Sequence, residues 1–237
     1  MPYLMPGTST EEVRVRNAAV AVLPIGSFEQ HGPYLPLITD TAIACIIANE
    51  IADAYPVQCL PPVTISCSHE HNAWPGTVSI SSRTLYAIVA DVQQSLRQSG
   101  IGKLILVNGH GGNYVLKNIV QEATVDGPRM ALFPASADWA QARAAAGMAT
   151  SDHEDMHAGE LETSILLHGC PELVRGGYET ADHLADERAD LLTVGIEAYT
   201  TSGIIGRPSL ASASKGKSAV GSLIESFTHC MKVLTDD

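Results

Sequence analysis

The chain has 237 residues and a formal net charge of -12, with 14 lysines and arginines against 26 aspartates and glutamates. This length fits a single α/β domain over residues 1–237, and the acidic balance argues against nucleic acid, which is bound through lysine and arginine. The chain has five cysteines without a Cys-x-x-Cys pair, and residues 1–6 do not resemble a secretory signal. It also has no apolar run long enough to cross a bilayer. These features predict a soluble, cytoplasmic protein that binds no membrane.

The first predicted strand, Ala18–Leu23, is followed by candidate metal ligands. Alternate residues of an extended segment point to the same side, so Glu29 and His31 would project together into one cavity. Open α/β sheets commonly bind ligands just past the strand ends. Asp40 lies where a helix over residues 42–54 is expected to begin, so its carboxylate could be a third ligand or the N-cap of that helix.

A polar loop over residues 66–77 follows a short apolar run that two prolines end. Long loops in compact domains are often functional. His69 and His71 could both be metal ligands or hydrogen-bonded structural groups, and we expect His71 to face a substrate pocket. An amphipathic helix is predicted over residues 83–97.

Lys103–Val107 is the clearest buried strand in the sequence, and a glycine-rich polar turn follows it. His110 lies in this turn, with glycines on both sides that keep bulk away from the imidazole. The turn could also hold phosphate, because a helix is predicted over residues 114–124. It lacks the Gly-x-Gly-x-x-Gly spacing and the Lys-Ser/Thr pair of phosphate loops, so we rank that interpretation lower.

A third polar cluster, residues 152–164, leads into an apolar helix. Carboxylates at a helix start are explained by the helix dipole alone. If the helix begins by His157, then His157 and Glu160 share a face, whereas Glu162 joins them only if the turn is irregular. Spacing alone does not choose between the two glutamates.

The rest of the chain is predicted to hold a strand at residues 130–134, a helix at 139–148 and a closing helix at 218–234. Residues 202–217 are rich in glycine, serine and alanine, which predicts a loop that serves as a lid or as a contact with another subunit. A phosphorylated substrate would need a basic pocket, and the clustered candidates are Arg207, Lys215 and Lys217.

Three motifs, in this order, resemble the creatininase family of metal-dependent amidohydrolases. They are Gly-Ser-Phe-Glu-Gln-His-Gly-Pro at 26–33 with Thr-Asp-Thr at 39–41, Asn-Gly-His-Gly-Gly-Asn at 108–113, and His-Ala-Gly-Glu-Leu-Glu-Thr-Ser at 157–164. The Glu-His-x-x-x-Pro-Gly-Thr stretch at 70–77 also fits the family. The resemblance implies a three-layer α/β/α sandwich with a mainly parallel sheet, a binuclear metal centre, and a homohexamer whose neighbouring subunits help shape the site.

The resemblance also implies roles for individual residues. The residues that match the family's metal ligands, with Asp40 as the bridging carboxylate, are Glu29, His31, Asp40 and His110. His157 matches the histidine that faces the substrate, and we expect it to be catalytic.

The chain departs from creatininase itself at Gly111 and Gly112, where that enzyme has an aromatic residue and a metal-binding glutamate. One metal is therefore short of an anionic ligand. We expect Glu162 to supply it, with Glu160 as the weaker candidate. Gly111 has no side chain and leaves room for a substrate, so we expect it to line the substrate pocket together with His71.

The expected cofactors are two divalent ions, zinc first, with manganese or iron(II) as alternatives, because mixed nitrogen and oxygen ligands suit all three. The leading hypothesis is hydrolysis of a non-peptide C-N bond in a small-molecule amide, cyclic amide or formamide. Family members with the Gly-Gly version include a formylaminopyrimidine nucleotide hydrolase and the peptidase that trims the mycofactocin precursor. The alternatives are therefore a peptidase acting on a short peptide, and a metal-binding or scaffold protein without catalysis.

Overall fold

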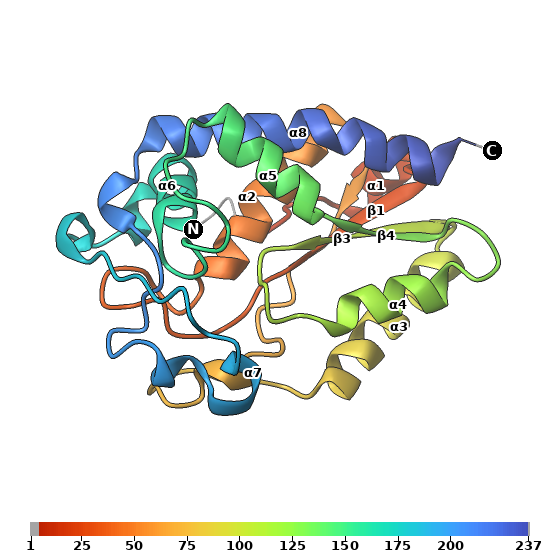
Figure 1. Cartoon of the computed structure of the whole chain (residues 1–237). Coiled ribbons are helices and arrows are strands. Elements are labelled where there is room, and N and C mark those ends of the chain that lie inside the picture. The colour runs from red at the N-terminus through yellow and green to blue at the C-terminus, as the bar shows by residue number, and fades with distance from the viewer. Residues whose placement is uncertain (1–4, 237) are drawn as a thin grey trace.

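The computed structural model describes residues 5–236 and shows a sheet between two layers of helices (Figure 1). Residues 1–4 lie outside the described residues. They belong to the segment 1–6, which we expect not to be a secretory signal. The strands are β1 (Val20–Ile25), β2 (Gln58–Cys59), β3 (Lys103–Asn108) and β4 (Met130–Phe133). The α-helices are α1 (Thr10–Arg16), α2 (Thr39–Ala54), α3 (Ser82–Gln98), α4 (Val115–Ala123), α5 (Ser136–Ala145), α6 (Glu160–Gly169), α7 (Leu191–Val194) and α8 (Ala213–Thr235).

β1 and β3 form the centre of a sheet whose four described strands are all parallel, in the order β2-β1-β3-β4. All six residues of β1 are buried, as are the four middle residues of β3. Helices cover both faces of the sheet, which explains why apolar residues run consecutively along these strands. The first strand extends two residues past its predicted end, to Ile25.

Two layers of helices bury the two faces of the sheet. Helices α2, α5, α6 and α8 lie on one side, and α3 and α4 lie on the other (Figure 1). α3 buries Leu85, Val89 and Leu96, which recur at helical intervals as expected for an amphipathic helix. The predicted three-layer α/β/α sandwich is confirmed.

The strand order changes direction at β1. The chain passes from β1 through α2 to β2 on one edge, and then through α3 to β3 on the other side of β1. Ile25 and Asn108, the last residues of β1 and β3, are paired in register. Open α/β sheets bind ligands outside the carboxyl ends of their strands at such a switch point. The loops that follow Ile25 and Asn108 therefore begin side by side at that position.

Two helix boundaries differ from the sequence-based expectation. α8 begins at Ala213 rather than at residue 218, because the Ser212 side chain accepts a hydrogen bond from the backbone of Lys215 and caps it. The predicted loop over 202–217 therefore ends before Lys215. α8 has 23 residues, yet neither it nor any other helix within residues 5–236 is both long and apolar enough to cross a bilayer.

Candidate metal centre

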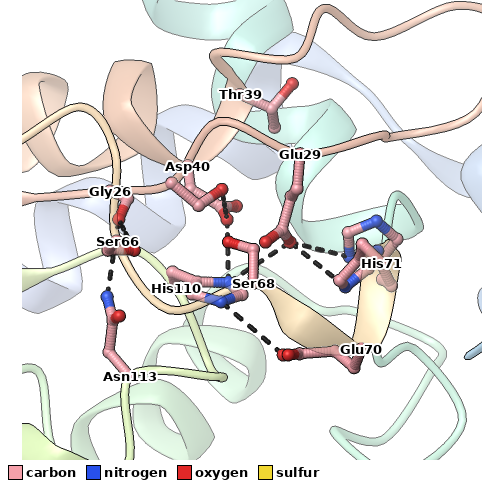
Figure 2. Close-up of polar contacts among 12 residues, drawn as sticks. Gly26, Glu29, Thr39, Asp40, Ser66, Ser68, Glu70, His71, His110 and Asn113 are labelled. Carbon is pink, nitrogen blue, oxygen red and sulfur yellow. Dashed lines mark hydrogen bonds and ion pairs between the residues drawn. The ribbon is translucent and has the colours of Figure 1, made fainter. Parts of the chain in front are cut away.

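Four buried polar side chains meet where β1 and β3 end. Glu29 and His31 come from the loop after β1, His110 from the loop after β3, and Asp40 from the first turn of α2. Figure 2 shows the carboxylates of Glu29 and Asp40 directed at the ring of His110. The structure thus brings together the four residues that the resemblance matched to metal ligands.

The carboxylate of Asp40 lies between two histidines. Its Oδ1 is 3.0 Å from Nε2 of His31, and its Oδ2 is 2.9 Å from Nδ1 of His110. The alternative interpretation, that this carboxylate caps α2, is wrong, because the N-cap residue is Ile38 and no side chain caps the helix. Asp40 Oδ2 instead accepts a hydrogen bond from Ser27 Oγ at 2.7 Å, which fixes the carboxylate toward the strand ends.

The outward-facing ring nitrogen of each of these histidines is hydrogen bonded to a main-chain carbonyl. Nδ1 of His31 lies 3.0 Å from the carbonyl oxygen of Glu29, and Nε2 of His110 lies 2.8 Å from that of Cys67. A carbonyl only accepts, so each outward nitrogen donates its N–H, and the inward nitrogen is the one that can bind a cation once its own proton is lost. This arrangement is typical of histidines that bind metal.

Glu29 is the least satisfied carboxylate of the cluster. Its Oε1 is 3.2 Å from Nδ1 of His110 and 3.3 Å from Nε2 of His71. These contacts are poorly aligned for hydrogen bonds, and within residues 5–236 neither of its two buried oxygens has a hydrogen-bond partner. A buried carboxylate without partners is costly, whereas a bound cation would satisfy it. The donor set therefore fits a cation beside Glu29.

The polar atoms form overlapping groups that could each hold an ion, with ligand atoms within 4.8 Å of one another. Two of these groups share Asp40. The first consists of Glu29, Asp40 and His110, and the second of His31, Asp40 and Glu162. Carboxylate and imidazole donors of this kind suit zinc, manganese or iron(II).

Glu162 reaches the cluster because the chain turns irregularly ahead of α6. The helix begins at Glu160, and Ala158 adopts a positive φ of 53°. Oε2 of Glu162 accepts the N–H of Ala158 at 2.6 Å and lies 3.9 Å from Nε2 of His31. The irregular turn thus places Glu162 on the same side as His157.

Glu160 lies in a separate hydrogen-bonded environment. Its Oε2 accepts from the backbone N–H of Thr150 at 3.1 Å and from the hydroxyl of the same residue at 2.7 Å, and Lys215 forms an ion pair with Oε1. These contacts fully occupy the carboxylate. The structure therefore does not bring Glu160, the weaker candidate, to the cluster.

His71 and His157 complete the wall opposite Asp40. Nε2 of His71 and Nδ1 of His157 lie 3.3 Å and 3.9 Å from Oε1 of Glu29, and the two rings have centroids 4.4 Å apart. His69 is bonded through Nδ1 to Ser79 Oγ instead, on the outside of the turn. Of the two loop histidines, the structure thus brings only His71 to the site.

The histidines differ in how their surroundings change their pKa values. Burial lowers the pKa of His31, but the neighbouring Asp40 more than offsets this effect and raises it to about 9. Burial lowers the pKa of His71 to about 4, and burial together with His31 holds that of His157 well below its usual range. His71 and His157 are therefore neutral at neutral pH.

The two carboxylates around His31 also shift in opposite directions. Burial would raise the pKa of Asp40, but His31 and His110 hold it well below its usual value. Burial raises the pKa of Glu162 to about 7, an effect that His31 only partly opposes. Metal binding therefore has to displace a proton from His31 and, below about pH 7, from Glu162 as well.

Two cavities open onto the cluster. One, of about 250 Å³, lies between β3 and α5 and is lined on its apolar side by Trp139, Met156 and Leu161. The other, of about 120 Å³, is lined by His71, His157 and Leu191 among others. Gly111 lines both cavities, and a Cβ atom there would meet nothing within 4 Å. Gly111 therefore borders both cavities, and its expected contact with a substrate stays a prediction.

Gly112 is enclosed, unlike Gly111. A Cβ atom on Gly112 would overlap both Oε1 of Glu70 and Nε2 of His110. Glu70 itself lies 3.7 Å from Nε2 of His110, on the side of the ring away from Asp40 (Figure 2). Glu70 was not among the residues that we expected at the site from the sequence. Its position inside the Glu-His-x-x-x-Pro-Gly-Thr stretch was the available signal.

The three basic residues considered for a phosphate pocket do not form one. Lys215 is paired with Glu160, and Nε of the Arg207 guanidinium lies 3.6 Å from Oδ2 of Asp182. Lys217 lies on α8. None of the three lines either cavity that opens onto the cluster.

The arrangement has counterparts in known proteins. A family profile named Creatininase and described as creatinine amidohydrolase matches residues 6–231. The chain belongs to the creatininase family. The match confirms the resemblance over nearly the whole chain. The members of this family are hydrolases.

Relatives within the family carry different names. The chain is 33% identical to the mycofactocin precursor peptide peptidase of Mycolicibacterium smegmatis and 32% identical to that of Mycobacterium ulcerans; these matches cover 95% and 92% of this chain and 90% and 87% of the relatives. It is 25% identical to the 2-amino-5-formylamino-6-ribosylaminopyrimidin-4(3H)-one 5'-monophosphate deformylase of Methanococcus maripaludis, over 65% of this chain and 71% of that protein.

Solved creatininases share the fold. A single-substitution mutant of creatininase superposes with a TM-score of 0.80 at 21% identity, covering 95% of this chain and 96% of that one. A second mutant, described as Zn-Zn type, gives a TM-score of 0.78 at 22% identity, covering 95% of each chain. At these identities the similarity establishes the fold.

Proposed function

We propose that this protein is a hydrolase that uses two divalent metal ions to cleave an amide bond. The observation that carries the proposal is the shared carboxylate of Asp40, whose two oxygens face His31 and His110 at 3.0 Å and 2.9 Å. Bound there, two ions would polarise a carbonyl group and make water acidic enough to act as a nucleophile near neutral pH.

In this proposal Glu29, Asp40 and His110 hold one ion, and His31, Asp40 and Glu162 hold the other. Zinc is our first choice because one similar solved creatininase is described as Zn-Zn type, and manganese is the alternative because another is described as a manganese form. Element analysis of the purified protein tests the assignment. We expect two ions per chain.

His157 is the proposed catalytic residue. Its neutral ring directs Nδ1 toward Glu29, so this nitrogen can take a proton from the attacking water and return it to the leaving nitrogen. We expect His157→Ala to retain both metal ions and to lose turnover. Retained turnover in that variant would remove His157 from the mechanism.

We infer that the substrate is a short peptide. The relatives that are 32–33% identical over most of their length are named as peptidases of a precursor peptide. The cavity of about 250 Å³ beside the cluster has an apolar wall that includes Trp139, Met156 and Leu161, which suits one amino-acid side chain. The peptidase alternative therefore has more support than the non-peptide substrate that the sequence analysis ranked first.

A formylated small molecule is the second candidate. The deformylase relative favours it, but its phosphorylated substrate would need basic groups near the site, and Arg207 and Lys215 are already paired with carboxylates. A panel of short peptides, formamides and cyclic amides, tested with the zinc-loaded protein, separates the two candidates. Faster hydrolysis of formamides than of every peptide would reverse our ranking.

The same panel tests whether the protein is an enzyme at all. A fully metal-loaded protein that cleaves no member of the panel would support the metal-binding or scaffold alternative. We also propose a homo-oligomer, with the hexamer as the expected state, because Leu192 and Val194 are exposed apolar residues on α7. Light scattering coupled to size-exclusion chromatography measures the subunit number.

A further inference from the structure

Gln30 lies between two proposed metal ligands in the sequence, and its side-chain amide is held in one orientation. The amide oxygen Oε1 accepts the backbone N–H of Gly32 at 3.0 Å, and the amide nitrogen Nε2 donates to the carbonyl oxygen of Gly203 at 3.0 Å. Exchanging the amide oxygen and nitrogen would break both hydrogen bonds. The amide nitrogen is therefore fixed on the side that faces His71.

This orientation determines which nitrogen of His71 carries the proton. The amide nitrogen of Gln30 lies 2.9 Å from Nδ1 of His71 and can only donate. Nδ1 must then accept, so the ring proton is on Nε2. Nε2 lies 3.3 Å from Oε1 of Glu29. His71 thus presents an N–H group to the proposed metal centre.

The main chain of Gln30 determines the orientation of His157. Nε2 of His157 lies 2.7 Å from the carbonyl oxygen of Gln30, which can only accept. The ring proton is therefore on Nε2, and Nδ1 turns a lone pair toward Oε1 of Glu29 at 3.9 Å. The two adjacent histidines consequently offer the centre opposite groups, an N–H from His71 and a lone pair from His157.

We propose that Gln30 is a positioning residue that makes His71 a hydrogen-bond donor to the substrate carbonyl oxygen while His157 remains the proton acceptor. The chemistry rests on the proposed function, and the protonation pattern rests on the hydrogen bonds alone.

The proposed hydrolysis moves one proton from water to the leaving nitrogen through His157. Water loses a proton to Nδ1 of His157 as its oxygen bonds to the carbonyl carbon, and the carbonyl oxygen takes the electron pair and accepts the N–H of His71. The C–N bond then breaks, and His157 returns the proton to the leaving nitrogen.

The variant Gln30→Glu tests the proposal because a carboxylate can only accept. We expect it to move a proton to Nδ1 of His71 and to leave His157 unchanged, since His157 contacts the main chain. Nitrogen-15 NMR of histidine-labelled, zinc-loaded protein shows which nitrogen of each ring carries the proton. The variants His71→Leu and His157→Ala assign the signals. Gln30→Met, which removes the donor without adding charge, replaces Gln30→Glu if that variant does not fold, and His71 should then lose its fixed pattern.

Kinetics provide a second readout. We expect Gln30→Glu to lower kcat about 10²-fold, the usual effect of losing one oxyanion donor, with both metal ions retained. In a His71→Leu background the same change should have no further effect, because the group through which Gln30 acts is gone. His71→Gln, which keeps an N–H at the distance of Nε2, should retain more activity than His71→Leu.

The outcomes separate the two proposals. A wild-type His71 with its proton on Nδ1, or a Gln30→Glu effect that persists without His71, overturns the role of Gln30 and leaves the hydrolase assignment intact. The expected protonation pattern without hydrolysis of any amide overturns the catalytic role of His71 together with the proposed function.

Discussion

Two groups of buried carboxylates lie near each other and differ in how their oxygens are satisfied. At the start of α6, Asp155 accepts the backbone N–H groups of Glu160 and Leu161 at 2.5 Å and 2.9 Å and pairs with Arg143 at 3.0 Å. At the strand ends, both oxygens of Glu29 are buried and, within residues 5–236, make no hydrogen bond. Composition does not distinguish these groups, since both are acidic and close to histidines.

The number of hydrogen bonds that the protein donates to a buried carboxylate, rather than its charge, separates a structural carboxylate from one that is available to a ligand. The protein itself supplies donors to Asp155, so this side chain holds a turn in place. In the part of the chain that the structure describes, Glu29 accepts no hydrogen bond, so its burial is costly until a cation binds. Mutations in the two groups should therefore have opposite effects on stability and function.

The largest effect is expected for Glu29→Gln. Removing this carboxylate should leave one ion fewer per chain and abolish hydrolysis, while the metal-free protein gains on the order of 1 kcal/mol of stability because an unsatisfied buried charge is gone. Element analysis and thermal unfolding of the metal-free protein measure these changes. A Glu29→Gln protein that binds two ions would remove Glu29 from the ligand set.

Glu160→Gln should lower the stability of the protein and leave its metal binding unchanged. Breaking its pair with Lys215 removes one partner of a largely buried ion pair, so we expect a loss of about 2–4 kcal/mol in the free energy of unfolding. The lower part of this range allows for the partial exposure of Lys215. Denaturant titration gives the loss, and the stoichiometry of two ions per chain should be unchanged. Loss of an ion would show that Glu160 acts on the metal centre.

The two adjacent glycines provide a matched pair with a smaller expected effect. Gly112→Ala would press a methyl group on Nε2 of His110, which cannot move without breaking its bond to Cys67, so we expect metal affinity to fall about 10–100-fold. Gly111→Ala meets no atom within 4 Å and should leave affinity unchanged. Competition with a zinc-binding dye compares them, and equal affinities would contradict the close contact around Gly112.

The smallest effect concerns pH. In the metal-free protein the pKa of Glu162 is raised from 4.5 to about 7, and that of His31 from 6.5 to about 9. Both groups therefore stabilise the fold below their unfolded pKa values, and this contribution is lost as pH rises through about 7 and then about 9. Because zinc binds the unprotonated groups, zinc should raise Tm by more at pH 9 than at pH 6. An equal shift at both pH values would contradict this linkage.

Local patterns predicted the two central strands and part of the centre, whereas the three-layer arrangement was implied by the family resemblance. Continuous apolar runs marked β1 and β3, and polar residues directly after them marked Glu29, His31 and His110. Parallel strands bring their carboxyl ends to one edge, so convergence of these residues followed from the strand assignment.

The remaining features depend on contacts that no local pattern encodes. The choice of Glu162 over Glu160 follows from the positive φ of Ala158, which a helical spacing argument could not anticipate. Gln30 acquires its role through Gly203, which is 173 positions further along the chain. The phosphate pocket considered for Arg207, Lys215 and Lys217 depended on a loop that ends earlier than predicted. Lys215 belongs instead to a helix that starts earlier than its sequence indicates.

The backbone bridge between His157 and Ile205 has a consequence for how the protein is made. The carbonyl that orients Gln30 belongs to Gly203, so the segment that completes the wall around both histidines is synthesised 173 positions after Gln30. A nascent chain that already contains Glu29, Asp40 and His110 still lacks the partner that orders Gln30. A fully ordered pocket around His71 and His157 must therefore wait until residues 203–205 have been synthesised.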